Sequence, residues 1–586
     1  MLQRLVLSAI ILYSAAAWCA EADAIPAPKL KVSALIFTDV GELDFEPAPT
    51  SEWTLRYTID GWTPTAKSPA ICGPFRVGLS LPLTVAYVRP DGKVGEPLLI
   101  ECARHEPPEA ADLEPGILTA ASSGPFEKLP AISTLSKATI TKGEPRFAPQ
   151  PKGALTHQSG FLQIAKEGVY RFQISGDGPR ELRIAGARVV NATDSNSFML
   201  TKEGRVKLAP GFYSFQAAWI SIGSPEVPVV SIEGPDFALQ KIPSNLLFRN
   251  RFHLPVSGAS IQSTLPTFKQ NTSDLAIDGN EGTWYWGNKA AKADDAFTVT
   301  FSEPRKLSSL EALTGKPDGD NRLDHGVLEI SSDGKSWREV GKFLKGVARA
   351  DFQEEAVQAV RIRVTAQTGG WLAIREIAIN KKRAPPPEKF SAAINVDYSE
   401  TPDLKEWAER ALKDADEQFP VIAERLKSEG YTPPRQITLF FRKDMKGIAH
   451  AIGSKIEFAE GWIKAHPNDT GTVIHELTHV IQGYTHANNP GWLVEGIADY
   501  VRWFNWEPLA RRPKINPLKA KYSNSYQDSA AFLVWAEKTY DKELVCKLNK
   551  HMREGSYDSS LFQKFTGRDL EALGSEFSAS LKSKAD

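Results

Sequence analysis

Cysteine is scarce in this chain, and net charge is almost absent. The 586 residues include 4 cysteines, and 70 lysine and arginine residues are balanced by 71 aspartate and glutamate residues, which leaves a formal net charge of -1. Because both signs are interspersed, no basic surface is available for nucleic acid, and no nucleic-acid partner is predicted. After the first residues, no apolar run is long enough to span a bilayer, so the mature chain is predicted to have no transmembrane segment.

The few cysteines restrict both disulfide and metal chemistry. Cys72 and Cys102 fall in one predicted domain, where they either form a disulfide after export or remain two buried thiols. The sequence leaves both alternatives open. Cys546 is the only cysteine in the C-terminal part of the chain, so no thiolate is expected among metal ligands there.

The first 24 residues have the pattern of a secretory signal peptide. Arg4 supplies a basic start, residues 5–17 are apolar, and the small residues that end at Ala24 fit the cleavage rule. Cys19 raises the alternative of a lipid anchor, but the bulky Trp18 directly before it argues against one. The protein is therefore predicted to be secreted to the periplasm, the cell surface or the medium.

Two histidines in the C-terminal part stand at the spacing of a shared metal site. His475 and His479 are four residues apart, so a helix places both imidazoles on one face, where they can bind a single cation. Glu476 lies beside the first histidine and could take the proton of a water held by that cation. This five-residue pattern alone is weak, because it arises by chance in long sequences.

A second segment, residues 492–500, strengthens the metal-site prediction. Its apolar residues recur at helical spacing, whereas Glu495 and Asp499 lie one turn apart on another face. Pro490 and Gly491 break the chain before it, so the two helices can pack as an antiparallel pair. Glu495 is predicted to complete a zinc site that keeps one position for water. Asp499 could ligate instead, but its position better suits a hydrogen bond to a ligand histidine.

A zinc site with three histidines is the alternative to this arrangement. It requires glycine three residues after His479 and histidine six residues after it, where this chain has Gln482 and Thr485. Gly483 and His486 are each displaced by one residue, which rotates them by about 100° around a helix. His486 is therefore predicted to be a loop residue.

The region from about residue 393 onward resembles the plant basic secretory protein family and its bacterial relatives, which are classed as zinc peptidases. The matching stretches are INVDYSETPDLKEWAERAL, GIAHAIGSKIEFAEGWIKAHP, VIHELTHVIQGY and WLVEGIADYVRW. The resemblance implies His475, His479 and Glu495 as zinc ligands and Glu476 as the catalytic base. The later stretch YSNSYQDSAAFLVW implies Tyr526 as a hydrogen-bond donor to the oxyanion.

One stretch before the zinc helix has a predicted role in the cleft. Residues 455–462, KIEFAEGW, are expected to form an edge strand that pairs with an extended peptide. An ordinary sheet strand with no exposed edge is the alternative.

The upstream part of the chain alternates short apolar runs with turns, which predicts β-sandwiches. Residues 25–105 resemble the C-terminal domain of chitobiases, and no site is assigned there. Residues 106–116 form an acidic, proline-containing linker. Residues 112–249 resemble PA14 domains through FQISGDGPRELRIAG. That family uses two consecutive acidic residues for a calcium-dependent sugar site, where this chain has Gly176 and Asp177, so a structural role is expected instead.

Residues 254–380 resemble F5/8 type C, or discoidin-like, carbohydrate-binding modules. The matching stretches include LAIDGNEGTWYWGN and AVRIRVTAQTGGWLAIREIAI. The resemblance implies a structural Ca²⁺, with Asp278, Thr283 and Glu376 as candidate oxygen donors, although Asp and Thr can also cap such a turn without metal. Trp284 matches a position that is usually buried. The candidate glycan-binding residues are Trp286, Asn321, Arg322, His325 and Trp371.

The sequence as a whole predicts three N-terminal β-sandwich domains followed by an α+β, mainly helical, zincin-type metallopeptidase domain. The catalytic domain is expected over residues 391–586, after a proline-rich linker at 381–390. The predicted function is that of a secreted zinc endopeptidase that cleaves glycoproteins or cell-surface proteins, with accessory modules that bind glycans. The alternative is a carbohydrate-binding surface protein with an inactive peptidase-like domain. The complete set of ligands and base favours the first, because a degenerate enzyme is expected to lose one of them.

Overall fold

The computed structural model describes residues 24–582, with the exception of a set of short segments. The excepted residues are 106, 109–112, 128, 130–138, 144–146, 194–200, 251–258, 269–270, 278–283, 317–319, 381–389, 430, 486–487 and 525. The predicted signal peptide therefore lies outside the described residues, and secretion stays a prediction. Among the described residues, no helix is long and apolar enough to cross a membrane.

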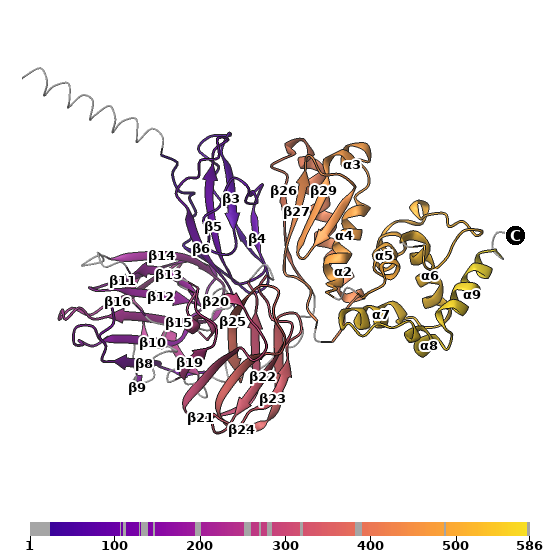
Figure 1. The fold of residues 1–586 in the computed structure, drawn as a ribbon. Helices are drawn as coiled ribbons and strands as arrows, with labels where there is room; N and C mark the ends of the chain where they lie inside the picture. Colours follow the sequence, from indigo (N-terminus) through magenta and orange to yellow (C-terminus); the bar gives the residue numbers. More distant parts are fainter. Residues whose placement is uncertain are drawn as a thin grey trace, which may run out of the picture. The chain divides into compact units, whose positions relative to one another are not determined.

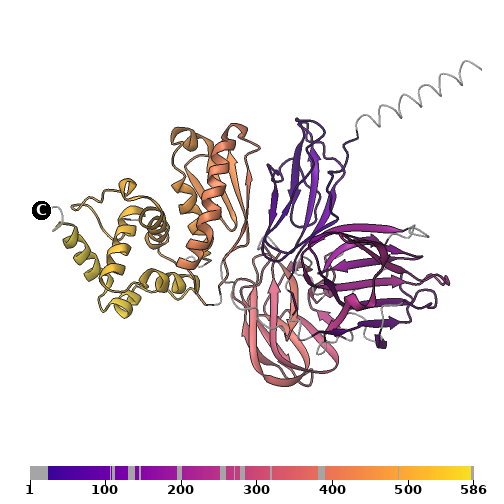
Figure 2. The same cartoon turned by 180° about the vertical axis from the view of Figure 1, so that it is seen from behind.

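The chain divides into two compact units, each of which is described by itself (Figures 1 and 2). The first contains residues 1–74 and 79–383, and the second contains residues 75–78 and 384–586. The first unit is rich in β-sheet, and the second is mainly helical. The chain is therefore a multidomain protein with a β-sandwich-rich N-terminal region and a helical C-terminal region, as the sequence predicted.

The first sheet of the N-terminal unit has four strands with a strongly apolar centre. Leu83 and Val85 are completely buried on its central strand. Cys72 and Cys102 are free thiols in this structure, but only Cys102 is buried, whereas Cys72 is half-buried. The strand order is β1 (Ala34–Phe37), β6 (Leu98–Arg104), β5 (Leu81–Val88) and β3 (Thr54–Thr58), and the short strands β2 (Gly41–Leu43) and β4 (Phe75–Val77) lie outside this sheet.

Two further sheets share one core, to which Phe172, Phe215 and Trp219 contribute fully buried rings. The loop at Gly176 and Asp177 is tied to this core, because the Trp219 Nε1 group donates to the Asp177 carbonyl at 2.7 Å. The eight-stranded sheet contains β7 (Leu113–Pro115), β8 (Ile117–Ser122), β9 (Thr139–Gly143), β10 (Leu155–Ile164), β12 (Arg180–Ile184), β13 (Ala187–Ala192), β15 (Gly211–Ile220) and β18 (Leu247–Asn250). The four-stranded sheet contains β11 (Gly168–Ser175), β14 (Lys202–Leu208), β16 (Val229–Gly234) and β17 (Phe237–Lys241).

The last sheet of this unit has seven strands and is built around two long antiparallel strands, β21 (Ala296–Thr314) and β24 (Val347–Val364). Their register shifts between Thr300 and Arg305, and such irregularities let long strands bend around a core. Trp284 is buried, as its family position implied. The other strands are β19 (Ala259–Ser263), β20 (Tyr285–Ala290), β22 (Gly326–Ser331), β23 (Arg338–Lys342) and β25 (Trp371–Ile379).

The second unit begins with a four-stranded sheet in the order β26 (Ala393–Asp397), β27 (Gln436–Arg442), β29 (Lys455–Ala459) and β28 (Ala449–Ile452). The helix α2 (Lys405–Arg425) lies along one face of this sheet (Figure 2). Its Trp407 ring packs on Phe441 and Phe458 of the strands, with ring centroids 5.7 Å from each. Aromatic packing between helix and sheet thus builds the support for the helices that follow.

The prediction for residues 455–462 as a free edge strand is wrong. Strand β29 is paired on both sides, in parallel with β27 and antiparallel with β28, and the chain then continues as helix α3 (Glu460–Ala465). The edge is formed by β28 instead, because a two-residue turn at Gly453, with φ of 61°, folds the preceding residues back onto β29.

The remaining helices carry the ligands and the core behind them. Helix α4 (Gly471–Gln482) ends at Gly483, whose φ of 57° is the left-handed conformation favoured by glycine at a helix end. Helix α5 (Gly491–Asp499) continues directly into a π-helical segment, η6 (Tyr500–Trp506). The later helices are α6 (Tyr526–Thr539), α7 (Leu544–Arg553), α8 (Ser560–Thr566) and α9 (Leu570–Lys582).

Candidate metal centre

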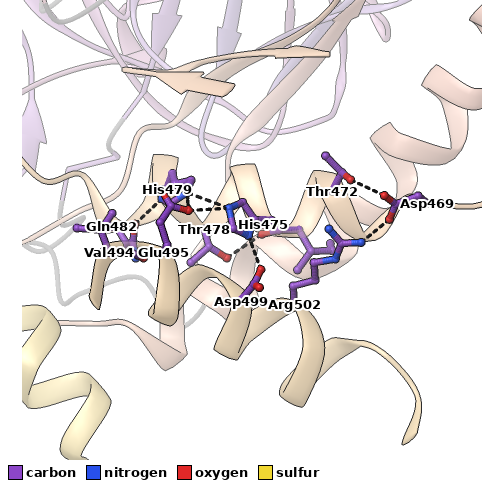
Figure 3. A network of polar contacts seen from close by, with 11 residues as sticks. Asp469, Thr472, His475, Thr478, His479, Gln482, Val494, Glu495, Asp499 and Arg502 are labelled. Carbon is purple, nitrogen blue, oxygen red and sulfur yellow. Dashed lines mark hydrogen bonds and ion pairs between the residues drawn. The ribbon is translucent and has the colours of Figure 1, made fainter. Parts of the chain in front are cut away.

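Helices α4 and α5 bring the three predicted ligands together. The Nε2 atoms of His475 and His479 are 3.1 Å apart, and Glu495 Oε2 lies 3.2 Å from the first and 3.4 Å from the second. A tetrahedral zinc ion with bonds of about 2.0–2.1 Å keeps its donor atoms roughly 3.3 Å apart. The two imidazoles and the carboxylate therefore fit one zinc ion, and Figure 3 shows them pointing toward one another.

The outer nitrogen of each imidazole is held by a hydrogen bond. His475 Nδ1 donates to Asp499 Oδ1 at 2.7 Å, and His479 Nδ1 donates to Gln482 Oε1 at 2.8 Å. The Gln482 amide is oriented in turn, because its Nε2 group donates to the Val494 carbonyl at 3.0 Å. Such bonds fix the tautomer that leaves each Nε2 lone pair available to a metal. Asp499 thus lies where the sequence predicted.

Gln482 is a residue of the candidate site that sequence reasoning missed. In the sequence, this position shows only that the glycine needed by a three-histidine site is absent. The available signal was its spacing of three residues from His479, which places a side-chain amide within reach of the outer ring nitrogen.

The carboxylates and imidazoles of the site perturb one another strongly. Burial lowers the pKa of His475, but its hydrogen bonds to Asp499 and Glu495 outweigh burial and raise the pKa to about 9. Burial raises the pKa of Glu495, but its bonds to His475 and His479 outweigh burial and lower the pKa to about 2. The buried Asp499 and the half-buried Glu495 thus favour positive charge at the point where the three donor atoms meet.

Glu476 is buried on α4 directly after the first ligand, and burial raises its pKa. A buried carboxyl group beside a metal position has the properties of a general base that must also release its proton. Its place on the helix is therefore consistent with the predicted role.

Tyr526 begins α6 and stacks on a ligand. Its ring centroid is 6.1 Å from that of His475, with 20° between the planes. The residue has a φ of 49°, which is unusual for a bulky side chain, and strain of this kind concentrates at functional sites. Tyr526 is 53% exposed, so the residue is accessible from solvent. The nearby charge of Glu495, together with burial, raises the pKa of Tyr526, which keeps the phenol protonated as a donor.

A second polar group ties the start of α4 to the segment after α5 (Figure 3). Asp469 accepts hydrogen bonds from the Arg502 guanidinium, from Thr472 Oγ1 at 2.9 Å and from Trp462 Nε1 at 3.2 Å. Arg502 belongs to η6, which follows the helix that carries Glu495. This group therefore links the two ligand-bearing helices at the end away from Gln482.

The glycan candidates of the discoidin-like sheet are only partly brought together. The rings of Trp286 and Trp371 are 5.3 Å apart, and Phe268 packs 5.0 Å from both. Asn321 is adjacent, because its carbonyl accepts a hydrogen bond from Ala373, two residues after Trp371.

The other glycan and calcium candidates of this domain do not join the aromatic group, or they lie outside the described residues. The Arg322 guanidinium pairs with Asp324 at 3.0 Å, and His325 is exposed in a turn. Asp278 and Thr283 lie outside the described residues, and Glu376 is buried on β25. The calcium site therefore stays a prediction. His486, in the other unit, also lies outside them, so its assignment to a loop stays a prediction.

Comparisons with known proteins define two parts of the chain. Residues 381–577 match the BSP family, described as "Peptidase of plants and bacteria". Residues 259–377 match the F5/8 type C domain. The helical C-terminal region thus carries a peptidase-family domain, and the sheet before it is a discoidin-type domain. The comparison with curated protein sequences finds no match.

Two of the similar solved structures each match about a fifth of the chain. A CBM32 module from a family 31 glycoside hydrolase of Clostridium perfringens shares 18% identity, over 21% of this chain and 94% of its own length, with a TM-score of 0.19. Chitosan-binding module 2 of a chitosanase/glucanase from Paenibacillus sp. IK-5, solved with chitotriose, shares 15% identity over 21% of this chain and 95% of its own, with a TM-score of 0.19.

Proposed function

We propose that the C-terminal unit is a zinc-dependent endopeptidase of the zincin class. The observation that carries this proposal is the group of three donor atoms, from His475, His479 and Glu495, which are 3.1–3.4 Å apart and available on one side of the site. The match to a peptidase family over residues 381–577 supports the peptide bond as the substrate. The outer hydrogen bonds to Asp499 and Gln482 support a built site rather than a chance group of side chains.

The residues around the ligands supply the proton transfers. When bound, zinc polarises the scissile carbonyl and lowers the pKa of water. Glu476 accepts the proton of the attacking water and passes it to the leaving amine. Tyr526 donates its phenolic hydrogen to the oxygen that becomes negative, which its exposed position at the start of α6 allows.

The substrate pairs with β28 in the proposed complex. This strand is the edge of the four-stranded sheet, and it packs against α4, the helix of the two histidines. An extended peptide that adds to this edge runs beside the ligands, with its backbone held by main-chain hydrogen bonds. The edge role predicted for residues 455–462 is thus transferred to Ala449–Ile452.

The discoidin-type domain binds glycans in this proposal and holds the enzyme on glycosylated substrates. Its sheet gathers Trp286, Trp371 and Phe268 with Asn321 beside them, and aromatic rings with a nearby amide suit the faces and hydroxyls of a sugar. The peptidase match favours this division of roles over a carbohydrate-binding protein with an inactive catalytic domain.

The test of the catalytic proposal is Glu476→Gln in the full-length protein. The amide is nearly isosteric but cannot accept a proton, so peptide hydrolysis should fall by at least roughly 100-fold. Zinc content, measured by elemental analysis, and the melting temperature should stay near those of the wild type. Freshly purified wild-type protein should hold about one zinc per chain and lose activity on chelation. An amide variant as fast as the wild type would remove Glu476 from the mechanism.

A further inference from the structure

Strand β28 leaves its outer edge open for another strand. Ile452 and Lys455 flank the two-residue turn, so they form a hydrogen-bonded pair that closes the hairpin. In an antiparallel ladder, hydrogen-bonded pairs alternate with pairs that are not hydrogen-bonded. His450, two residues before Ile452, therefore also directs its N–H and C=O groups toward β29. The N–H and C=O groups of Ala449 and Ala451 therefore point away from β29, toward the open edge. Among the described residues, no other strand pairs with that edge.

The side chains of β28 divide between two faces. Ala449 and Ala451 pack against the hydrophobic core of the unit. His450 and Ile452 lie on the opposite face, because successive side chains of a strand alternate. The His450 ring is partnered, with its Nε2 atom 3.2 Å from Glu457 Oε2. Ile452 is 69% exposed, which leaves most of an apolar side chain in water beside the open edge.

Natural edge strands are usually kept short or protected by charges, prolines or bulges. Strand β28 is short, with four residues, but it has no charge, proline or bulge at Ile452. An exposed isoleucine on an open edge gains most when an incoming strand places an apolar side chain directly opposite it, because cross-strand neighbours lie about 4.5–5.5 Å apart. The strand also packs against the histidine-bearing helix, so this incoming strand would be the substrate.

We propose that Ile452 is a specificity residue, which selects peptides that present an apolar side chain at the position opposite it. The inference rests on the proposed endopeptidase function and goes beyond it by naming a substrate feature. The neighbouring outward residue, His450, is engaged by Glu457 and offers no apolar surface. The preference should therefore be confined to one substrate position.

The experiment uses the full-length zinc-loaded protein and a fluorogenic heptapeptide series in which Leu replaces Ser at one position at a time. Wild-type enzyme should favour Leu at a single position. Ile452→Thr keeps a β-branched side chain for the strand but removes apolar surface, so kcat/KM for the Leu peptide should fall by about five- to tenfold, while that for the Ser peptide stays constant. Val421→Thr is the matched control, because Val421 is an exposed residue of α2.

A binding measurement separates this inference from the catalytic proposal. Fluorescence anisotropy with the Glu476→Gln variant should show tighter binding of the Leu peptide, and adding Ile452→Thr should abolish the difference. Equal effects on Leu and Ser peptides, or no preference in the wild type, would overturn the role of Ile452 and leave the peptidase intact. A stable dimer in sedimentation that Ile452→Thr dissolves would overturn it too, since a second chain would then occupy the edge. Failure to cleave or bind any peptide would remove both proposals.

Discussion

At the scale of single residues, the site depends on which atom of each imidazole is available. His475 and His479 each use Nδ1 in a hydrogen bond, to Asp499 and Gln482, so that Nε2 is left for the metal. Both acceptors are buried, and neither is a ligand. In the proposed zinc site, these acceptors hold the orientation and the tautomer of the rings, which would strengthen metal binding without adding a bond to the metal.

We expect Asp499→Ala and Gln482→Ala each to weaken zinc binding by about 10–100-fold, because each leaves one ligand imidazole without its orienting acceptor. Competition with a fluorescent zinc chelator measures the affinity. Thr478→Ala is the control, since this buried α4 residue donates its hydroxyl to the Ile474 carbonyl. Unchanged affinity in both variants, with the control also unchanged, would show that the hydrogen bonds serve the fold alone.

The grouping of the three proposed ligands, and the position of Asp499 beside His475, could be predicted from the sequence because the spacing of these residues is local. Residues four apart on a helix must share a face, and Glu495 and Asp499 repeat that relation on the next helix. Gln482 obeys the same geometry, but a glutamine three residues after a histidine carries no motif. Its role becomes evident only when Val494, from the neighbouring helix, orients its amide.

At the scale of elements, the relative position of α4 and α5 decides whether the donor atoms meet. The group around Asp469 links the start of α4 to Arg502 of η6. Gly471 makes room for it, because a Cβ atom there would lie 2.6 Å from Glu507 Oε1 and 2.7 Å from Arg502 Nε. A side chain at this position must push both groups away from the helix start.

Gly471→Ala is therefore expected to destabilise the protein by about 1–3 kcal/mol and to weaken zinc binding, since the added methyl group must displace the Arg502 side chain that pairs with Asp469. Gly461→Ala is the matched control, because Gly461 lies in helix α3 and a Cβ atom there meets nothing within 4 Å. That control should be neutral or stabilising by up to about 1 kcal/mol. Denaturant unfolding and zinc titration of both variants give the comparison, and equal behaviour of the two would refute the role of this contact.

Two elements of the catalytic unit could not be predicted from local pattern. The apolar spacing from Leu493 to Phe504 predicts one continuous helix, but the structure changes to a π-helix after Asp499, where Asn505 Nδ2 donates to the Tyr500 carbonyl at 3.0 Å. Strand β28 is four residues long with two alanines, so it carries little strand signal. Its pairing with β29 is set by the turn at Gly453 and by packing on α4. Sheet order is a long-range property that spacing does not encode.

At the scale of the whole molecule, the family matches separate a discoidin-type domain from a peptidase-family domain, and the proposed function assigns attachment to the first and catalysis to the second. The discoidin-type match at 259–377 directly precedes the peptidase match at 381–577 in sequence. A weak binding module raises the local concentration of substrate without changing the chemical step. Its contribution should therefore be largest when substrate is dilute and should fade near saturation.

The double substitution Trp286→Ala and Trp371→Ala tests this division in the full-length protein. Cleavage of a glycoprotein at low concentration should slow by about 10-fold or more, because linked modules raise apparent affinity by factors of this order. Rates at saturation, on the deglycosylated form and on short peptides should stay near wild type.

Trp337→Ala is the control, since this tryptophan of the same domain lies under the Arg361 guanidinium, 4.0 Å from the ring centroid. Because all three changes remove a large ring from one domain, a loss common to them would indicate misfolding. If only the double variant loses cleavage rate, and only on glycosylated substrate, the sugar binds at the aromatic group of Trp286 and Trp371. If the double variant and the wild type cleave every glycoprotein at equal rates, the domain is only a spacer.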